Sequence, residues 1–134
     1  MAVNKIVLLS NLALDMLHLE REKIPLILLL SRTDCHFCHE VRQNYLLPIA
    51  KTSSDKKLLM RELVSDRDTA LIGADGSRIT PAALLKEIKV NFFPTVVFLG
   101  SGMRVLAEAL VGLNRAGFYS AYLDQRIASA IKAA

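Results

Sequence analysis

The chain has 134 residues, of which 52% are hydrophobic and 22% charged, and its net charge is +4. This length and composition indicate a single folded domain with a buried core and exclude intrinsic disorder. Aromatic residues make up only 6% and tryptophan is absent, which argues against a nucleic-acid surface built on base stacking. The longest apolar run, residues 24–30, is far shorter than the ~20 residues that cross a bilayer, so no membrane span is expected.

The first half of the chain is expected to alternate between helix and strand. The order is helix, strand, helix and strand over residues 11–22, 25–31, 36–47 and 57–65. Leu12, Met16 and Leu19 share one stripe of the first helix. The first strand is apolar throughout, which is typical of a strand buried on both faces. We expect Pro48 to end the second helix, because proline lacks the N–H that continues the hydrogen-bond ladder.

The second half is expected to add a hairpin, two strands and two helices. In chain order these are a hairpin over 69–80, a helix over 81–89, strands over 95–99 and 105–111, and a helix over 116–132. Asp75–Gly76 supplies the hairpin turn, and Thr80–Pro81 is a favourable start for the helix that follows. One face of the last helix is expected to bury the residues spaced four apart, Tyr119, Leu123, Ile127 and Ile131.

The order of these elements indicates an α/β sandwich in one domain. That domain spans residues 1–134, with residues 1–24 as an N-terminal helical extension and residues 25–134 as the core.

The two cysteines, Cys35 and Cys38, follow the apolar strand directly and lie at the start of a helix. A bridge between them closes a loop too small to stabilise the fold much by chain entropy, so its value would be chemical. The start of a helix stabilises a thiolate. His36 could add positive charge there, whereas Asp34 opposes it. We expect Cys35 to be the exposed attacking sulfur and Cys38 the shielded resolving sulfur.

The same residues permit other interpretations. Cys35, Cys38 and His39 spell the C-x-x-C-H signature of c-type haem attachment, with Met60 or Met103 as the distal ligand. Copper or zinc could be bound by four neighbouring side chains, those of Cys35, His36, Cys38 and His39. The third alternative is a non-catalytic adaptor whose thiols are incidental. We expect neither a metal nor a cofactor beyond the cysteine pair.

Three segments taken together resemble the thioredoxin superfamily. They are residues 26–30, the motif Cys35–His36–Phe37–Cys38, and residues 93–99, within a match that spans residues 25–132. In that family a proline with a cis peptide bond starts a strand and packs against the cysteines, which implies this role for Pro94. The resemblance implies a thioredoxin-like fold, with a mixed central sheet flanked by helices and a short hairpin inserted before the cis-proline strand.

The resemblance also implies an activity, that of a thiol–disulfide oxidoreductase. Its partners would be protein thiols and disulfides and a redox partner protein. The implied catalytic residues are Cys35, Cys38, His36 and Pro94, and the implied substrate-binding residues are Phe37, Phe93 and Thr95. The backbone of Phe93 would pair with a strand of the substrate. We expect a monomer in the periplasm or cell envelope of a bacterium, with the cytoplasm as the alternative.

The chain departs from thioredoxin itself at the motif. Asp34 replaces the tryptophan that precedes the first cysteine, and His36–Phe37 replaces Gly–Pro between the cysteines. Leu29 replaces the buried acidic residue that accepts a proton from the second thiol. The direction of electron transfer and the redox potential are therefore left open.

Overall fold

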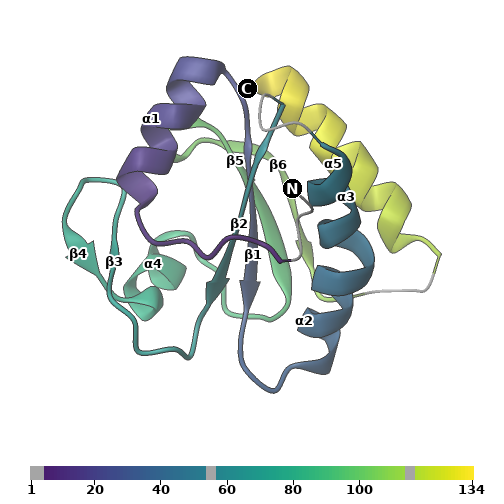
Figure 1. Ribbon diagram of the computed structural model, residues 1–134, viewed down its shortest axis with the longest axis horizontal. Coiled ribbons are helices and arrows are strands. Elements are labelled where there is room, and N and C mark those ends of the chain that lie inside the picture. The colour runs from purple at the N-terminus through teal and green to yellow at the C-terminus, as the bar shows by residue number, and fades with distance from the viewer. Residues whose placement is uncertain (1–4, 54–56, 114–116) are drawn as a thin grey trace.

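The computed structural model describes residues 5–53, 57–113 and 117–134 (Figure 1). Its elements in chain order are α1 (Leu12–Glu22), β1 (Leu26–Ser31), α2 (His36–Glu40), the π-helical η1 (Val41–Leu46), α3 (Leu47–Thr52), β2 (Leu59–Val64), β3 (Leu71–Ile72), β4 (Arg78–Ile79), α4 (Pro81–Glu87), β5 (Thr95–Leu99), the 3₁₀ turn η2 (Ser101–Met103), β6 (Val105–Val111) and α5 (Tyr119–Ala133). Within these ranges every helix is too short or too polar to span a membrane.

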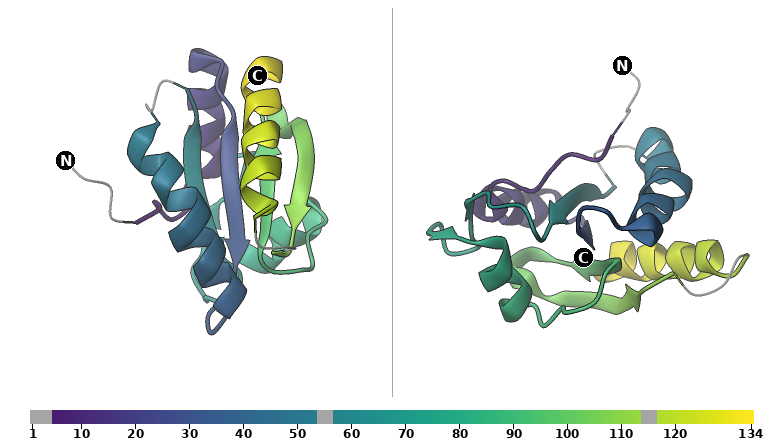
Figure 2. Two further views of the ribbon diagram at one scale, coloured as in Figure 1. Left: turned by 90° about the vertical axis from the view of Figure 1, so that its right-hand side faces the viewer. Right: turned by 90° about the horizontal axis from the view of Figure 1, so that it is seen from below.

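A four-stranded mixed sheet forms the centre of the molecule. The strand order is β2-β1-β5-β6, with β1 parallel to β2 and antiparallel to β5, and with β6 antiparallel to β5. All six residues of β1 are buried, as its apolar sequence predicts. The helices α3 and α5 pack on one face of the sheet, while α1 and α4 pack on the other (Figure 2). The chain therefore forms three layers, with the sheet in the middle.

The segment that precedes α1 lies along the outer edge of β2. The N–H of Leu9 donates to the carbonyl of Glu62 at 2.8 Å, and the N–H of Glu62 donates to the carbonyl of Val7 at 3.0 Å. On its other side the carbonyl of Ser10 accepts the N–H of Ile72 at 3.0 Å. This segment thus joins β2 to the β3–β4 hairpin.

Local sequence signals account for most element starts. Asn11 caps α1 by accepting the N–H of Leu14 at 3.1 Å, and Thr80 caps α4 by accepting the N–H of Ala83 at 3.1 Å. The expected hairpin is present as the antiparallel pair β3–β4. The expected apolar stripe of α1 is buried in the core, at Leu12, Met16 and Leu19.

The prediction that a helix ends at Pro48 is wrong. The helix continues from α2 through η1 into α3 and ends at Thr52. In η1 the hydrogen bonds span five residues, and the N–H of Leu47 donates to the carbonyl of Arg42. Pro48 then falls in the first turn of α3. The missing N–H does not interrupt the helix there, because the wider π-helical turn just before it shifts the hydrogen-bond register.

The predicted buried face of α5 is right for three residues and wrong for the fourth. Tyr119, Leu123 and Ile127 are buried, but Ala130 completes the face, and Ile131 is 39% exposed. A helix repeats every 3.6 residues, so a spacing of four drifts off the face after three steps. The expected start of this helix at residue 116 lies outside the described residues.

Candidate redox site

Cys35 and Cys38 lie where the chain leaves β1 and enters α2, and they form a disulfide with their Cα atoms 5.2 Å apart. The Sγ atom of Cys35 caps the helix by accepting the N–H of Cys38 at 3.2 Å. Cys35 is partly exposed, whereas Cys38 is fully buried. The expected contrast between an accessible and a shielded sulfur is confirmed.

The loop before Cys35 is held by a hydrogen-bonded carboxylate. Asp66, which follows β2, accepts the backbone N–H of Thr33 at 2.9 Å and also the Thr33 hydroxyl. These hydrogen bonds from Thr33 lower the pKa of Asp66, and the positive charge of Arg32 adds a smaller contribution. The loop that delivers Cys35 is therefore tied to the neighbouring strand of the sheet.

His36 points toward solvent and pairs with a carboxylate on its own helix. Its Nε2 atom lies 2.9 Å from Oε1 of Glu40, and its side chain is 76% exposed. Its ring contacts Phe37 with the centroids 5.6 Å apart, and Phe37 is itself 55% exposed. Glu40 offsets any positive charge that His36 brings to Cys35. His36 is therefore expected to stabilise a Cys35 thiolate less than the sequence alone suggests.

Pro94 lies beside the end of β1. The antiparallel register pairs Leu30 with Thr95, which brings the start of β5 to the end of β1, where the chain continues toward Cys35. The Phe93–Pro94 peptide bond is cis, and the Pro94 carbonyl accepts the N–H of Gly112 at 2.7 Å. Within the described ranges, the backbone of Phe93 makes no hydrogen bond to other backbone groups. Among the described residues, the N–H and the carbonyl of Phe93 are thus not used by the protein's own backbone.

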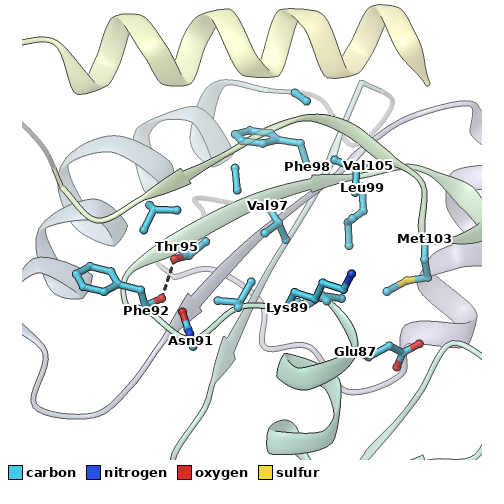
Figure 3. Close-up of a pocket in the computed structure, with 15 residues that line it drawn as sticks. Glu87, Lys89, Asn91, Phe92, Thr95, Val97, Phe98, Leu99, Met103 and Val105 are labelled. Atoms are coloured by element: carbon cyan, nitrogen blue, oxygen red, sulfur yellow. Dashed lines mark hydrogen bonds between the residues drawn. The ribbon is translucent and has the colours of Figure 1, made fainter.

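The side chain of Thr95 is less accessible to a substrate than the resemblance implies. Its side chain is buried, and its hydroxyl donates to the carbonyl of Phe92 at 2.7 Å. Both residues lie at one end of a mainly apolar cavity of about 510 Å³ between the β5–β6 face and the segment after α4 (Figure 3). Met103 lies toward the other end, and neither cysteine lines this cavity.

A partly buried ion pair below the cysteine helix is not predicted from the sequence. Glu62 on β2 accepts Nε of Arg42 at 2.8 Å, Nη2 of Arg42 at 2.6 Å and the hydroxyl of Ser31 at 2.6 Å. The hydrogen bond to Glu62 raises the pKa of Arg42. The parallel register pairs Glu62 with Leu29. Leu29 occupies the position where the resemblance to thioredoxin leads us to expect a buried acidic residue. One feature of the sequence pointed to this ion pair: Glu62 is the single carboxylate in the largely apolar strand β2.

A larger cavity, of about 710 Å³, opens beside Cys35. Three parts of the chain form its walls: the segment before α1, the loop and helix of the cysteines, and the end of β2 with the loop that follows. The charged and histidine side chains among its walls are Lys5, Arg32, Asp34, His36, His39, Arg42, Glu62 and Arg67. Cys35 lines this cavity and Cys38 does not.

Neither Met60 nor Met103, the two methionines considered as distal haem ligands, is placed to reach an iron held at the cysteine motif. Met60 is buried in the core, where it pairs in register with Ile27 near the start of β1. Met103 follows the end of β5, which runs antiparallel to β1, so it lies at the opposite end of the sheet from Cys35. Among the residues that the structure describes, no three His, Cys, Asp or Glu side chains are grouped to hold a metal ion.

No protein-family model matches this chain, and no curated protein matches it in sequence. Among solved structures it is similar to oxidised mitochondrial thioredoxin 3 from Saccharomyces cerevisiae, with TM-score 0.62 and 18% identity over 92% of this chain and 93% of that chain. It is similar to a DsbH oxidoreductase, with TM-score 0.64 and 20% identity over 98% and 87% of the two chains. It is also similar to oxidised thioredoxin O2 from Arabidopsis thaliana, with TM-score 0.61 and 14% identity over 94% and 99%.

The likeness to these structures establishes the architecture of the chain. It has a thioredoxin-like α/β fold, with a mixed central sheet flanked by helices. The expected fold class is confirmed.

Proposed function

We propose that this protein is a thiol–disulfide oxidoreductase that exchanges disulfides with partner proteins through Cys35 and Cys38. The observation that carries the proposal is the asymmetry of the pair. A partly exposed sulfur is bonded to a buried one at the start of a helix. An exposed sulfur can be reached by a partner, and a buried neighbour can then resolve the bond that forms. The fold shared with thioredoxins and with a DsbH oxidoreductase supports the same activity.

In the reductive direction the reduced pair starts the reaction. The Cys35 thiolate attacks one sulfur of the partner disulfide, and the other partner sulfur leaves as a thiolate, so a mixed disulfide forms. Cys38 then loses its proton and attacks the Cys35 sulfur, which releases the second partner thiolate. The partner gains two electrons and the Cys35–Cys38 pair loses two. The oxidative direction is the reverse of these steps.

The surroundings of Cys35 suit both of its roles. The Cys38 N–H that reaches Cys35 Sγ at 3.2 Å stabilises negative charge on that sulfur after reduction. The available backbone of Phe93 would pair with the partner's chain, beside Pro94. The exposed ring of Phe37 would add apolar contact. We propose a monomer that works in the periplasm or cell envelope of a bacterium, which rests on the sequence resemblance alone.

Reduction of insulin by dithiothreitol, followed by turbidity, tests the proposal. The wild-type protein should accelerate the reaction, and Cys35→Ser should not exceed the uncatalysed rate. Arg21→Gln, a change at the exposed last turn of α1, serves as the control and should match wild type. Acceleration that survives Cys35→Ser would contradict the proposed function.

A further inference from the structure

The strand order gives Cys35 two different flanks. Because β1 lies between β2 and β5, the sulfur that follows β1 has the start of β5 on one side and the end of β2 on the other. The β5 side carries Phe93 and Pro94, to which the proposed function assigns the partner's backbone. The β2 side is the wall of the 710 Å³ cavity. We propose that this second flank, which we call the basic flank, selects partner disulfides that have acidic residues next to the reacting cysteine.

The basic flank consists of Lys5, Arg32 and Arg67. All three side chains are exposed and line the cavity that contains Cys35. Within residues 5–53, 57–113 and 117–134, none of them forms an ion pair with a carboxylate. The fourth cation of the cavity, Arg42, is occupied by Glu62. The three cations of the basic flank therefore remain available to a ligand.

Besides Glu62, which is paired with Arg42, two carboxylates lie near the basic flank and limit its strength. Asp34 lines the cavity, and Asp66 lies outside it, where it is bound by Thr33 and is close enough to Arg32 for that charge to lower its pKa. Asp66 offsets the charge of Arg32 in part, so Lys5 and Arg67 carry the charge that is least offset among the described residues. Positive charge therefore predominates along this wall.

Backbone hydrogen bonds hold the segments from which these two side chains extend. Lys5 lies two residues before Val7, whose carbonyl accepts the N–H of Glu62 on β2 at 3.0 Å, and the N–H of Arg67 donates to the carbonyl of Val64 at 3.3 Å. Adjacent strands lie about 4.8 Å apart, so a partner chain crossing the end of β1 brings residues near its cysteine within reach of this wall. A guanidinium binds a carboxylate through two parallel hydrogen bonds, which suits Arg67 to an aspartate or glutamate of the partner.

Charge of this kind acts on the rate of encounter more than on affinity. Exposed ion pairs add little binding energy each, but complementary charge accelerates association at low salt. The inference thus predicts a salt-dependent preference in the second-order rate constant of disulfide exchange. It names a substrate class for the proposed oxidoreductase and depends on that function.

Two synthetic peptide disulfides test the preference. Their sequences are identical except that aspartates beside the cysteine in one are asparagines in the other. Reduction of each by the reduced protein is measured at about 10 mM and about 1 M salt, where charges are screened over roughly 30 Å and 3 Å. We expect the aspartate peptide to react about tenfold faster at low salt and at nearly the same rate as its counterpart at high salt.

Two variants test whether Lys5 and Arg67 cause the preference for the aspartate peptide. The double variant Lys5→Gln/Arg67→Gln should reduce the ratio of the two low-salt rates to about one or two. Arg21→Gln removes the same kind of charge from the last turn of α1, which leads into the opposite end of β1 (Figure 1), and should keep the full ratio.

The outcomes separate this inference from the proposed function. Equal low-salt rates of the wild-type protein on both peptides would overturn the acidic preference and leave the oxidoreductase standing. A full ratio in the double variant would overturn the assignment to Lys5 and Arg67. The proposed function itself would be overturned if the reduced wild-type protein reduced neither peptide, or if the Cys35→Ser variant reduced them.

Discussion

Glu62 on β2 and Arg42 on the helix that carries the cysteines form a two-point, partly buried ion pair at 2.8 and 2.6 Å. Glu62 is almost completely buried, and Ser31 at the end of β1 provides its third hydrogen bond. The pair therefore links the helix to the two strands beneath it, close to Cys35.

Arg42→Ala should destabilise the fold strongly. The change leaves a buried carboxylate with only the Ser31 hydroxyl as a side-chain partner, at an expected cost of about 3 kcal/mol in the free energy of unfolding. The double variant Arg42→Met/Glu62→Leu removes both charges and should recover most of that loss. Urea unfolding at neutral pH measures both. A loss below about 1 kcal/mol for Arg42→Ala would show that the pair does not bear on stability.

The bond between Thr33 and Asp66 should make stability depend on pH. The pKa of Asp66 is lowered in the folded state relative to about 3.9 in the unfolded chain. Its stabilising effect is thus present above about pH 4 and is lost as the pH falls through the lowered value. Asp66→Asn should therefore reduce stability at neutral pH and make little difference below the folded-state pKa.

Carbon-detected NMR titration of Asp66 provides the direct check. In Thr33→Val the hydroxyl donor is lost, so the pKa of Asp66 should rise toward its ordinary value. An unchanged titration in this variant would contradict the cause assigned to the shift.

Cys38→Ser should trap the partner on Cys35. Without the buried resolving thiol, the mixed disulfide has no internal route to release. Incubation of the reduced variant with oxidised insulin, followed by mass spectrometry without reductant, should detect the adduct. The double variant Cys35→Ser/Cys38→Ser is the control and should give none. An adduct in the control, or its absence in Cys38→Ser, would argue against the assigned roles.

The buried face of α5 can be checked with two alanine variants. Leu123 is fully buried, so Leu123→Ala should cost about 3 kcal/mol and lower Tm clearly. Ile131 lies on the exposed side, so Ile131→Ala should change stability by less than about 0.5 kcal/mol. Thermal unfolding of the two variants in parallel gives the comparison. Similar losses for both would place Ile131 back on the buried face.

Local signals predicted β1, the β3–β4 hairpin and the start of α4, and of these β1 leads directly to the cysteines. The apolar run that forms β1, the cap at Thr80 and the turn at Asp75–Gly76 each act within a few residues, so they can be read without knowing the fold. The prediction that Pro48 ends the helix is wrong because the π-helical segment before it changes the hydrogen-bond register. The position of the proline in a helix depends on that shift, which the sequence pattern does not reveal.

The parts of the site that escaped prediction depend on distant residues. Glu62 is acceptable in the interior only because Arg42, twenty residues earlier, reaches it. Lys5 and Arg67 line one cavity because the segment before α1 follows the edge of β2. Such convergence is a property of the strand order and cannot be obtained from spacing along the chain.

The attachment of residues 7–9 to β2 has a consequence for how molecules of this protein can meet. That segment uses backbone groups of Glu62 that would otherwise face a neighbouring molecule, whereas β6 lies at the other end of the sheet with Val105 and Val111 exposed. A sheet open at both ends can add copies indefinitely and grow into a fibre. With backbone groups of β2 already used by residues 7–9, this edge offers fewer of them to a second copy, in keeping with the monomer that we propose.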